Sequence, residues 1–144
     1  MNIYFITYKT DRPICPFTRK LLTMQLRIEK DSRIKDIQQE FSACYPYLKI
    51  EFLRDNTVPG QNIAKAEKAS PVAFIRELTP LRNPAWINID SKKTVKEMEE
   101  DFQKYLRLTI KIFRKSGNSW VIPFLTNDWS LDKQNKEGES FPLY

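Results

Sequence analysis

Two stretches of the chain repeat one another, and this internal repeat constrains the fold more than any other feature of the sequence. Residues 28–41 align with residues 89–102 at an offset of 61, with apolar positions matching apolar positions. After a one-residue slip near Pro46, the alignment continues at an offset of 60 as far as Arg54 and Arg114. Because loops tolerate insertions, a slip beside a proline is typical of a duplicated unit.

Each copy has the pattern of a strand, a helix and a second strand. Residues 24–29 and 86–90 alternate apolar and polar side chains, as half-buried strands do, and residues 48–54 and 108–114 do so again. Between these strands, apolar residues recur at helical spacing: Ile34, Ile37, Phe41 and Cys44 in the first copy, and Val95, Met98, Phe102 and Tyr105 in the second.

The order of elements predicts an α+β domain made of duplicated βαβ units that form a ferredoxin-like sandwich. In that fold two helices cover one side of a mainly antiparallel four-stranded sheet. We expect a single domain over residues 24–138, with repeat copies at 24–54 and 86–114. Residues 1–23 are expected to be a peripheral N-terminal segment, and residues 139–144 a frayed tail.

A C-terminal β-α extension follows the second copy and is expected to have no counterpart in the first. Residues 120–122 predict an edge strand, because Pro123 cannot donate to a sheet. Residues 130–137 predict a helix that Gly138 ends. Between the two copies, Pro71 begins another short helix.

Composition excludes several classes of site. The chain has no histidine, which removes most zinc sites and the common Ser-His and Cys-His catalytic pairs. Cys15 and Cys44 form no close pair, so no disulfide framework is indicated, as suits a reducing compartment. We assign no catalytic residue, no metal ligand and no cofactor. With no apolar run of membrane-spanning length, the sequence predicts a soluble, cytoplasmic protein without membrane contact.

The net charge of +6 permits contact with polyanions, but the basic residues are dispersed along the chain. RNA-binding versions of a ferredoxin-like fold stack bases on aromatic residues of the central strands. The corresponding strands here, residues 24–29 and 86–90, offer only Trp86. Nucleic acid is therefore disfavoured as a partner, although weak binding through the basic surplus stays open.

One region concentrates aromatic and hydrogen-bonding side chains and is the candidate binding surface. A guanidinium can fork onto an anion, and a turn can present backbone N–H groups to one. The same residues can instead simply pack the extension onto the sheet. The candidate residues are Arg114, Lys115, Asn118, Trp120, Asp128, Trp129 and Gln134.

From Met24 onward the chain resembles an uncharacterised family of small bacterial proteins, seen mostly in Bacteroidetes. The similarity lies in residues 47–52, 94–102, 113–120 and 126–135. Where that family has a Phe-Gly-type turn, this chain has Tyr105, Leu106 and Arg107. The resemblance implies no assigned activity.

The sequence thus favours a non-enzymatic binding or protein-interaction module with an unknown protein partner. Two alternatives remain. One is an enzyme or a nucleotide- or anion-binding protein that uses the surface from Arg114 to Gln134, and the other is a weak nucleic-acid binder.

Overall fold

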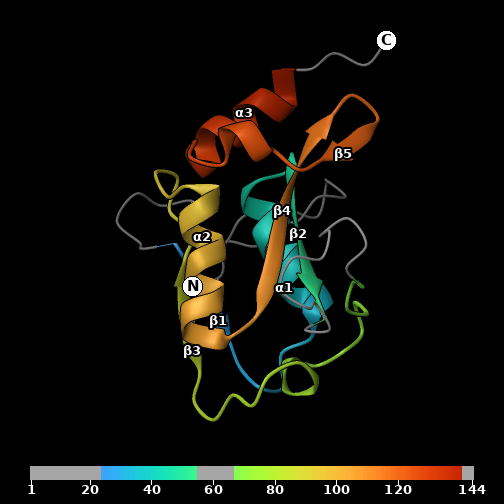
Figure 1. Cartoon of the computed structure of the whole chain (residues 1–144), viewed down its shortest axis with the longest axis vertical. Coiled ribbons are helices and arrows are strands. Elements are labelled where there is room, and N and C mark those ends of the chain that lie inside the picture. The colour runs from blue at the N-terminus through green and yellow to red at the C-terminus, as the bar shows by residue number, and fades with distance from the viewer. Residues whose placement is uncertain (1–23, 55–66, 141–144) are drawn as a thin grey trace, which may run out of the picture.

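A computed structural model describes residues 24–54 and 67–140 of the chain (Figure 1). The expectations for residues 1–23 and 141–144 lie outside the described residues. The described part is a mixed α+β fold. Its elements in chain order are β1 (Gln25–Ile28), α1 (Ile34–Cys44), β2 (Leu48–Leu53), η3 (Ile75–Glu77), β3 (Ala85–Asn88), α2 (Val95–Asp101), η4 (Phe102–Leu106), β4 (Thr109–Ser116), β5 (Ser119–Val121), η5 (Phe124–Thr126) and α3 (Leu131–Ser140).

Both repeat copies have the expected order of strand, helix and strand, as β1-α1-β2 and β3-α2-β4. The two helices bury matching side chains, because the apolar positions recur every three or four residues. Thr94 begins α2 with a reciprocal cap, in which its hydroxyl accepts from the Glu97 N–H and the Glu97 carboxylate accepts from the Thr94 N–H. The buried residues are Ile34, Ile37 and Phe41 on α1, and Val95, Met98 and Phe102 on α2 and η4. Tyr105, expected on the same face, is exposed, because the π-helical turn η4 buries Leu106 instead.

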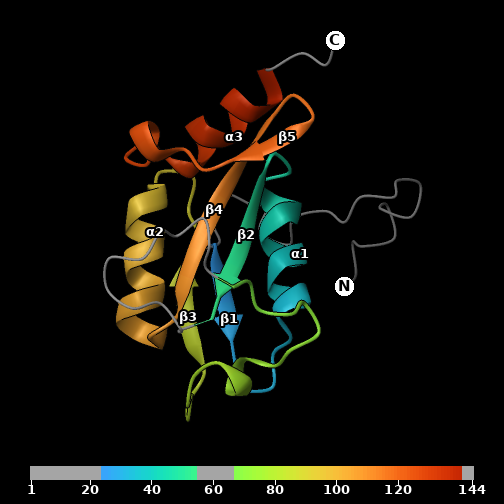
Figure 2. The same ribbon diagram turned by 45° about the vertical axis from the view of Figure 1, so that its right-hand side comes forward.

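The ferredoxin-like sandwich is not confirmed, because the strands form two sheets instead of one. β1 pairs with β3 in a two-stranded antiparallel sheet, and β2, β4 and β5 form a separate three-stranded one. Figure 2 shows α1 and α2 on opposite sides of the β2–β4 pair, with β1 and β3 behind it. Periodicity determines which face a strand buries but not which strand lies beside it, so the pattern could not reveal this pairing.

The strand registers place equivalent positions of the two aligned spans opposite one another. Leu26 lies opposite Ile87 in the β1–β3 ladder, and Ile87 is its counterpart at the offset of 61. Glu51 lies opposite Lys111 in the β2–β4 ladder, and Lys111 is its counterpart at the offset of 60. In a twofold arrangement a residue on the axis meets its own equivalent, and the register of each ladder is of this kind.

The C-terminal extension does have a counterpart in the first copy, so the expectation that it is unique was wrong. One segment of each copy crosses the start of a helix and hydrogen-bonds to its unpaired backbone groups: residues 71–77 at α1, and residues 127–133 at α2. Each segment then begins a helix, which is the single turn η3 in the first copy and α3 in the second. The matching N–H to carbonyl bonds are Ile34 to Ala73 (3.0 Å) and Val95 to Trp129 (3.4 Å), and Ile75 to Ser32 (2.9 Å) and Leu131 to Lys93 (2.7 Å).

The expected C-terminal helix is present but longer than predicted, because it continues through Gly138 to Ser140. Gly138 does not end this helix. A Cβ atom added there would lie 2.9 Å from the Tyr47 Cβ and 3.3 Å from the Arg114 Cγ. The glycine therefore allows α3 to approach the start of β2 and the end of β4.

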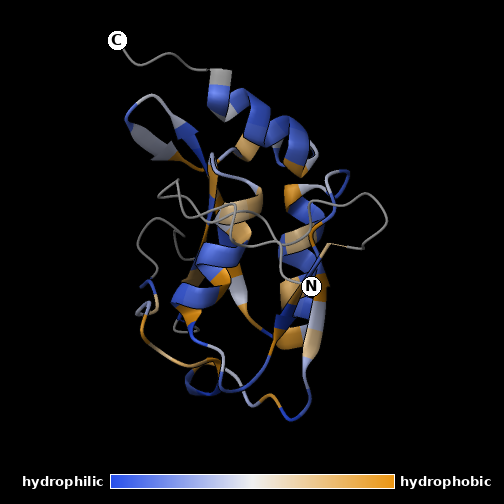
Figure 3. Cartoon of the chain, turned by 180° about the vertical axis from the view of Figure 1, so that it is seen from behind, coloured by the Kyte–Doolittle hydropathy of each residue, from blue (hydrophilic) through white to orange (hydrophobic). Residues whose placement is uncertain are grey.

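One hydrophobic core lies between the two sheets and the helices. In Figure 3, bands of hydrophobic and hydrophilic residues alternate along α1 and α2, as helices with one buried side require. The buried Tyr45 hydroxyl donates to the Ile89 carbonyl at 2.6 Å, and the buried Thr79 hydroxyl donates to the Leu106 carbonyl at 2.8 Å. These bonds satisfy carbonyl groups that would otherwise be buried without a partner.

Cys44, half-buried on α1, is disulfide-bonded. The sequence indicated no disulfide framework, so this bond is a correction, and the cysteines do not support a reducing compartment. Within residues 24–54 and 67–140, no helix is long and apolar enough to cross a membrane.

Candidate binding surface

Arg114 and Gln134 lie close together, but they bind each other inside the fold. The Arg114 Nη1 donates to the Gln134 Oε1 at 2.8 Å, and the Gln134 side chain is fully buried. The Gln134 amide also donates to the Thr126 backbone carbonyl. This network ties α3 and η5 to β4. The Arg114 Nε atom is buried there without a hydrogen-bond partner, which makes the network costly to assemble.

Asp128 and Trp129 belong to the segment that crosses the start of α2. Asp128 is exposed, and Trp129 is half-buried with its carbonyl accepting from the Val95 N–H. The Lys133 ammonium lies 4.0 Å from the Trp129 ring centroid. Asn118 is exposed in the turn between β4 and β5, beside Gly117, whose φ of +60° suits glycine.

Lys115 and Trp120 lie in a third place, on the side of the three-stranded sheet that faces away from the core. They are opposite one another in the β4–β5 ladder, and the Lys115 Nζ lies 5.1 Å from the Trp120 ring centroid. The seven sequence-predicted residues therefore divide between an internal network, a segment at the start of a helix and a sheet face. They do not make one continuous site.

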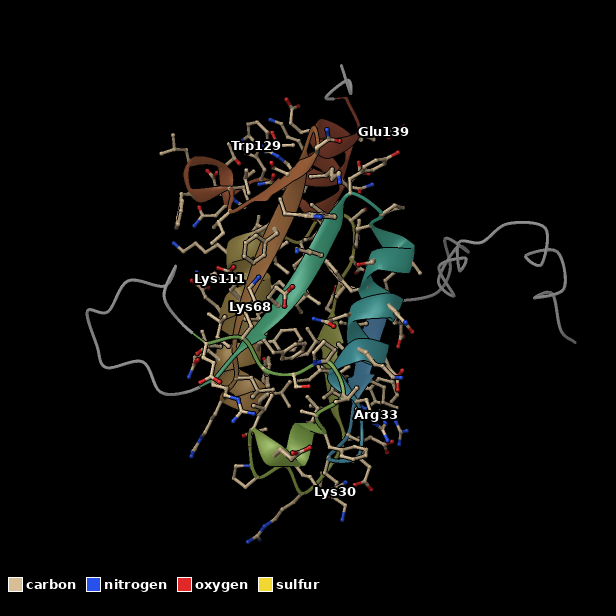
Figure 4. The ribbon with its side chains drawn as sticks, turned by 90° about the vertical axis from the view of Figure 1, so that its right-hand side faces the viewer. Lys30, Arg33, Lys68, Lys111, Trp129 and Glu139 are labelled. Carbon is tan, nitrogen blue, oxygen red and sulfur yellow. The ribbon has the colours of Figure 1, made fainter. Side chains whose placement is uncertain are left out.

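The sheet face that holds Lys115 and Trp120 contains a larger cluster, which we call the lysine–aromatic face. Figure 4 shows the labelled Lys68 and Lys111 beside the β2–β4 pair on this face. Alternation along β2 and β4 places its residues on one side, because Leu48, Ile50, Ile110 and Ile112 point into the core. The face consists of Lys49, Glu51, Lys68, Lys111, Phe113, Lys115 and Trp120.

Lysine side chains surround both aromatic rings of this face. The Phe113 ring centroid has the Lys49 Nζ at 5.3 Å and the Lys68 Nζ at 5.2 Å. Lys49 also lies 5.0 Å from the Trp120 ring centroid, so its ammonium is shared by the two rings. Such cation–π contacts hold the ammonium groups at the ring faces, where the negative part of the ring quadrupole lies.

The lysine–aromatic face carries a net positive charge. Glu51 forms ion pairs with Lys49 at 3.6 Å and with Lys68 at 4.0 Å. Lys111 pairs with Glu99 of α2 at 3.4 Å. The four lysines of the face therefore outnumber the two carboxylates that lie beside them. Of the three paired lysines, Lys68 is exposed, whereas Lys49 and Lys111 are half-buried beside Glu51 and Glu99.

Sequence reasoning did not find Phe113, Lys49, Lys68 or Lys111 as site residues. Lys49 and Glu51 alternate with buried residues along β2, and Lys111, Phe113 and Lys115 do so along β4. That alternation was the only available signal. The alternation indicates a shared surface only because β2 and β4 are neighbouring strands.

Glu99 and Lys111 also border a small cavity beside the face. The cavity encloses about 20 Å³ and is lined mainly by apolar residues, including Val95, Ile122 and Phe124. The Ile112 N–H donates to the Glu99 carboxylate at 3.3 Å. Burial raises the pKa of Glu99, while the neighbouring Lys111 opposes that rise. The volume holds about one water molecule and no substrate.

In the part of the chain that the structure describes, no three His, Cys, Asp or Glu side chains are grouped so as to hold a metal ion. No family model, curated protein or solved structure matches the chain. The resemblance to a family of small bacterial proteins and the cytoplasmic location both stay predictions. Function is therefore inferred from the geometry of the described residues.

Proposed function

We propose that the protein is a non-enzymatic binding module, and that the lysine–aromatic face holds a macromolecular partner. One observation carries this proposal. Two aromatic rings lie on a sheet face away from the core, with three lysine ammonium groups within 5.3 Å of their centroids. Aromatic side chains outside the core are enriched where proteins bind other molecules, because they bury a large area with little loss of side-chain freedom.

The shape of the face supports a large, extended partner. Phe113, Lys115 and Trp120 lie on neighbouring strands of a sheet, which presents a broad surface instead of an enclosed pocket. Small ligands bind in cavities of roughly 300–1,000 Å³. The cavity beside Glu99 encloses only about 20 Å³.

Anion binding or catalysis at the surface from Arg114 to Gln134 has less support. The Arg114 guanidinium already donates to the Gln134 side chain, which is fully buried. The Arg114 Nε, which has no hydrogen-bond partner, is buried, so an anion could reach it only by entering the contact between α3 and β4. The pair is better explained as a clamp between two parts of the fold.

The proposal is tested by capture from an extract of the native cell, with captured protein and captured nucleic acid measured separately. The face variant Lys49→Glu/Lys115→Glu reverses two charges of the lysine–aromatic face. The control variant Lys96→Glu/Lys104→Glu reverses two exposed charges on α2 and η4, where Lys104 lies 5.2 Å from the Tyr105 ring centroid. Circular dichroism confirms that both variants are folded.

We expect the wild type and the control to retain the same macromolecule, and the face variant to lose it. Equal capture by all three proteins would show that the partner binds elsewhere. Absence of any specific capture by the wild type would also count against a binding module.

A further inference from the structure

We propose that the lysine–aromatic face binds single-stranded nucleic acid, with bases stacked on Phe113 and Trp120 and phosphates beside the lysines. This inference rests on the proposed binding function and names its partner. It differs from the sequence-based expectation, which disfavoured nucleic acid because β1 and β3 carry few aromatic residues. The rings lie instead on β4 and β5.

The two rings are placed as neighbours on one surface. Trp120 lies opposite Lys115, and Phe113 is two residues from Lys115 along β4, so Phe113 and Trp120 are diagonal neighbours on the same side of the sheet. Diagonal neighbours in an antiparallel ladder are about 7–8 Å apart. Proteins that read single strands splay unpaired bases onto aromatic side chains of such a sheet surface.

The lysines supply the charge that a phosphate backbone requires. Lys49 lies within 5.3 Å of both ring centroids, Lys68 is 5.2 Å from Phe113, and Lys115 is 5.1 Å from Trp120. A base that stacks on either ring would displace ammonium groups from the ring face, and these flexible side chains could then pair with its phosphates. Lysine is a flexible point charge, which suits binding to phosphates without selection for sequence.

Other polyanions fit the face less well. A DNA duplex is read by a helix or ribbon that enters a groove, whereas Phe113 and Trp120 lie on the surface of a sheet. An acidic peptide would pair with the lysines but would gain no base stacking from the rings. The presence of both rings among the lysines therefore favours a single strand, and the net charge of +6 adds to the attraction.

The test is fluorescence polarisation of the full-length protein with labelled 15-nucleotide oligo-dT and oligo-U. Phe113→Leu and Trp120→Leu keep apolar bulk but remove the ring. We expect each to weaken binding about five- to a hundredfold, because base–aromatic stacking contributes that much per base. The matched control is Trp86→Leu, since Trp86 is an exposed ring on a strand, with the Arg27 guanidinium 5.5 Å from its centroid. Its affinity should equal that of the wild type.

Salt dependence tests the role of the lysines. Each phosphate contact on a single strand contributes about −0.7 to the slope of log affinity against log salt. Lys49→Gln and Lys115→Gln should each make the slope shallower by about that amount, whereas Lys104→Gln should leave it unchanged. Equal slopes in all three variants would contradict phosphate binding at this face.

A direct measure of stacking does not depend on affinity. In the variant Trp86→Phe/Trp129→Phe, Trp120 is the only tryptophan. Oligo-dT should quench its fluorescence, and a poly-glutamate peptide of the same charge should not. Equal effects of the two polymers, or equal affinity of the ring variants and the wild type, would overturn the inference. If no oligonucleotide binds at low salt while the face still captures a protein from extract, this inference fails and the proposed binding function stands.

Discussion

Leu26 lies directly opposite Ile87 in the β1–β3 ladder, and the two residues occupy the same position in the two halves of the repeat. The pair Glu51 and Lys111 has the same relationship in the β2–β4 ladder. Each aligned span therefore contributes one strand to the β1–β3 ladder and one to the β2–β4 ladder, and β5 extends the second sheet beside β4. Both ladders join a strand of one aligned span to a strand of the other, so the packing of each span depends on the other.

The matched phenylalanines of the two helices should both be essential to the core. Phe41 and Phe102 are fully buried, and the Phe102 ring contacts Phe52 edge to face with centroids 5.7 Å apart. Replacing either by Ala should lower the free energy of unfolding by about 3–5 kcal/mol. Urea denaturation measures this loss. A loss below about 1 kcal/mol in both variants would mean that the helices do not pack as described.

Gly138→Ala should destabilise the protein although alanine favours helices. The added methyl group would lie 2.9 Å from the Tyr47 Cβ and would push α3 away from β2. We expect a loss of about 1–3 kcal/mol in thermal or urea denaturation. Glu139→Ala, at an exposed position on the same helix, should change stability by less than about 0.5 kcal/mol. A stabilising effect of Gly138→Ala would show that α3 does not approach Tyr47 so closely.

Arg107→Gly should stabilise the protein. Arg107 follows the π-helical turn η4 with a φ of 54°, in the left-handed region that costs a residue with a side chain about 1–2 kcal/mol. Because glycine pays an entropic cost of its own, we expect a net gain of about 0.5–1 kcal/mol. Arg107→Ala keeps the left-handed penalty and should give no gain. An equal gain from both variants would instead point to removal of the charge.

Glu99 should make the protein less stable as the pH rises. Burial raises the pKa of Glu99, so the folded chain binds more protons at this group than the unfolded chain does. Its contribution to stability is then lost as the pH rises through the unfolded and then the folded pKa. The free energy of unfolding of Glu99→Gln, minus that of the wild type, should increase as the pH rises above the ordinary glutamate pKa of about 4.3. Urea titrations at intervals above this pH measure it, and a decreasing difference would contradict burial of the charge.

Much of the fold could be predicted from the sequence because it is recorded in side-chain periodicity. Ile34, Ile37 and Phe41 were predicted to share a buried helical face, and this is confirmed. The strand partners could not be predicted, because pairing is set by contacts between distant residues. The match between residues 71–77 and 127–133 was also hidden. The contacts that these two segments share are hydrogen bonds between backbone groups, which require no particular side chains and so leave no pattern in the sequence.

The candidate site was harder to predict for a related reason. Arg114 and Gln134 have the chemistry of a binding site, but a buried network and an exposed one look alike in sequence. Phe113 and Lys49 appeared as ordinary strand residues, since nothing in the sequence shows that β2 lies beside β4. The lysine–aromatic face exists only through that pairing.

Chemical-shift mapping tests the central claim most directly. A ¹⁵N-labelled sample of the full-length protein is titrated with oligo-dT, and the amide signals of residues 24–54 and 67–140 are followed. The perturbed amides should cluster on β2, β4 and β5 around Lys49, Phe113 and Trp120, while those of β1, β3 and α1 stay in place. Perturbations centred on Arg27 and Trp86, or spread evenly over the basic surface, would contradict a binding site on the lysine–aromatic face.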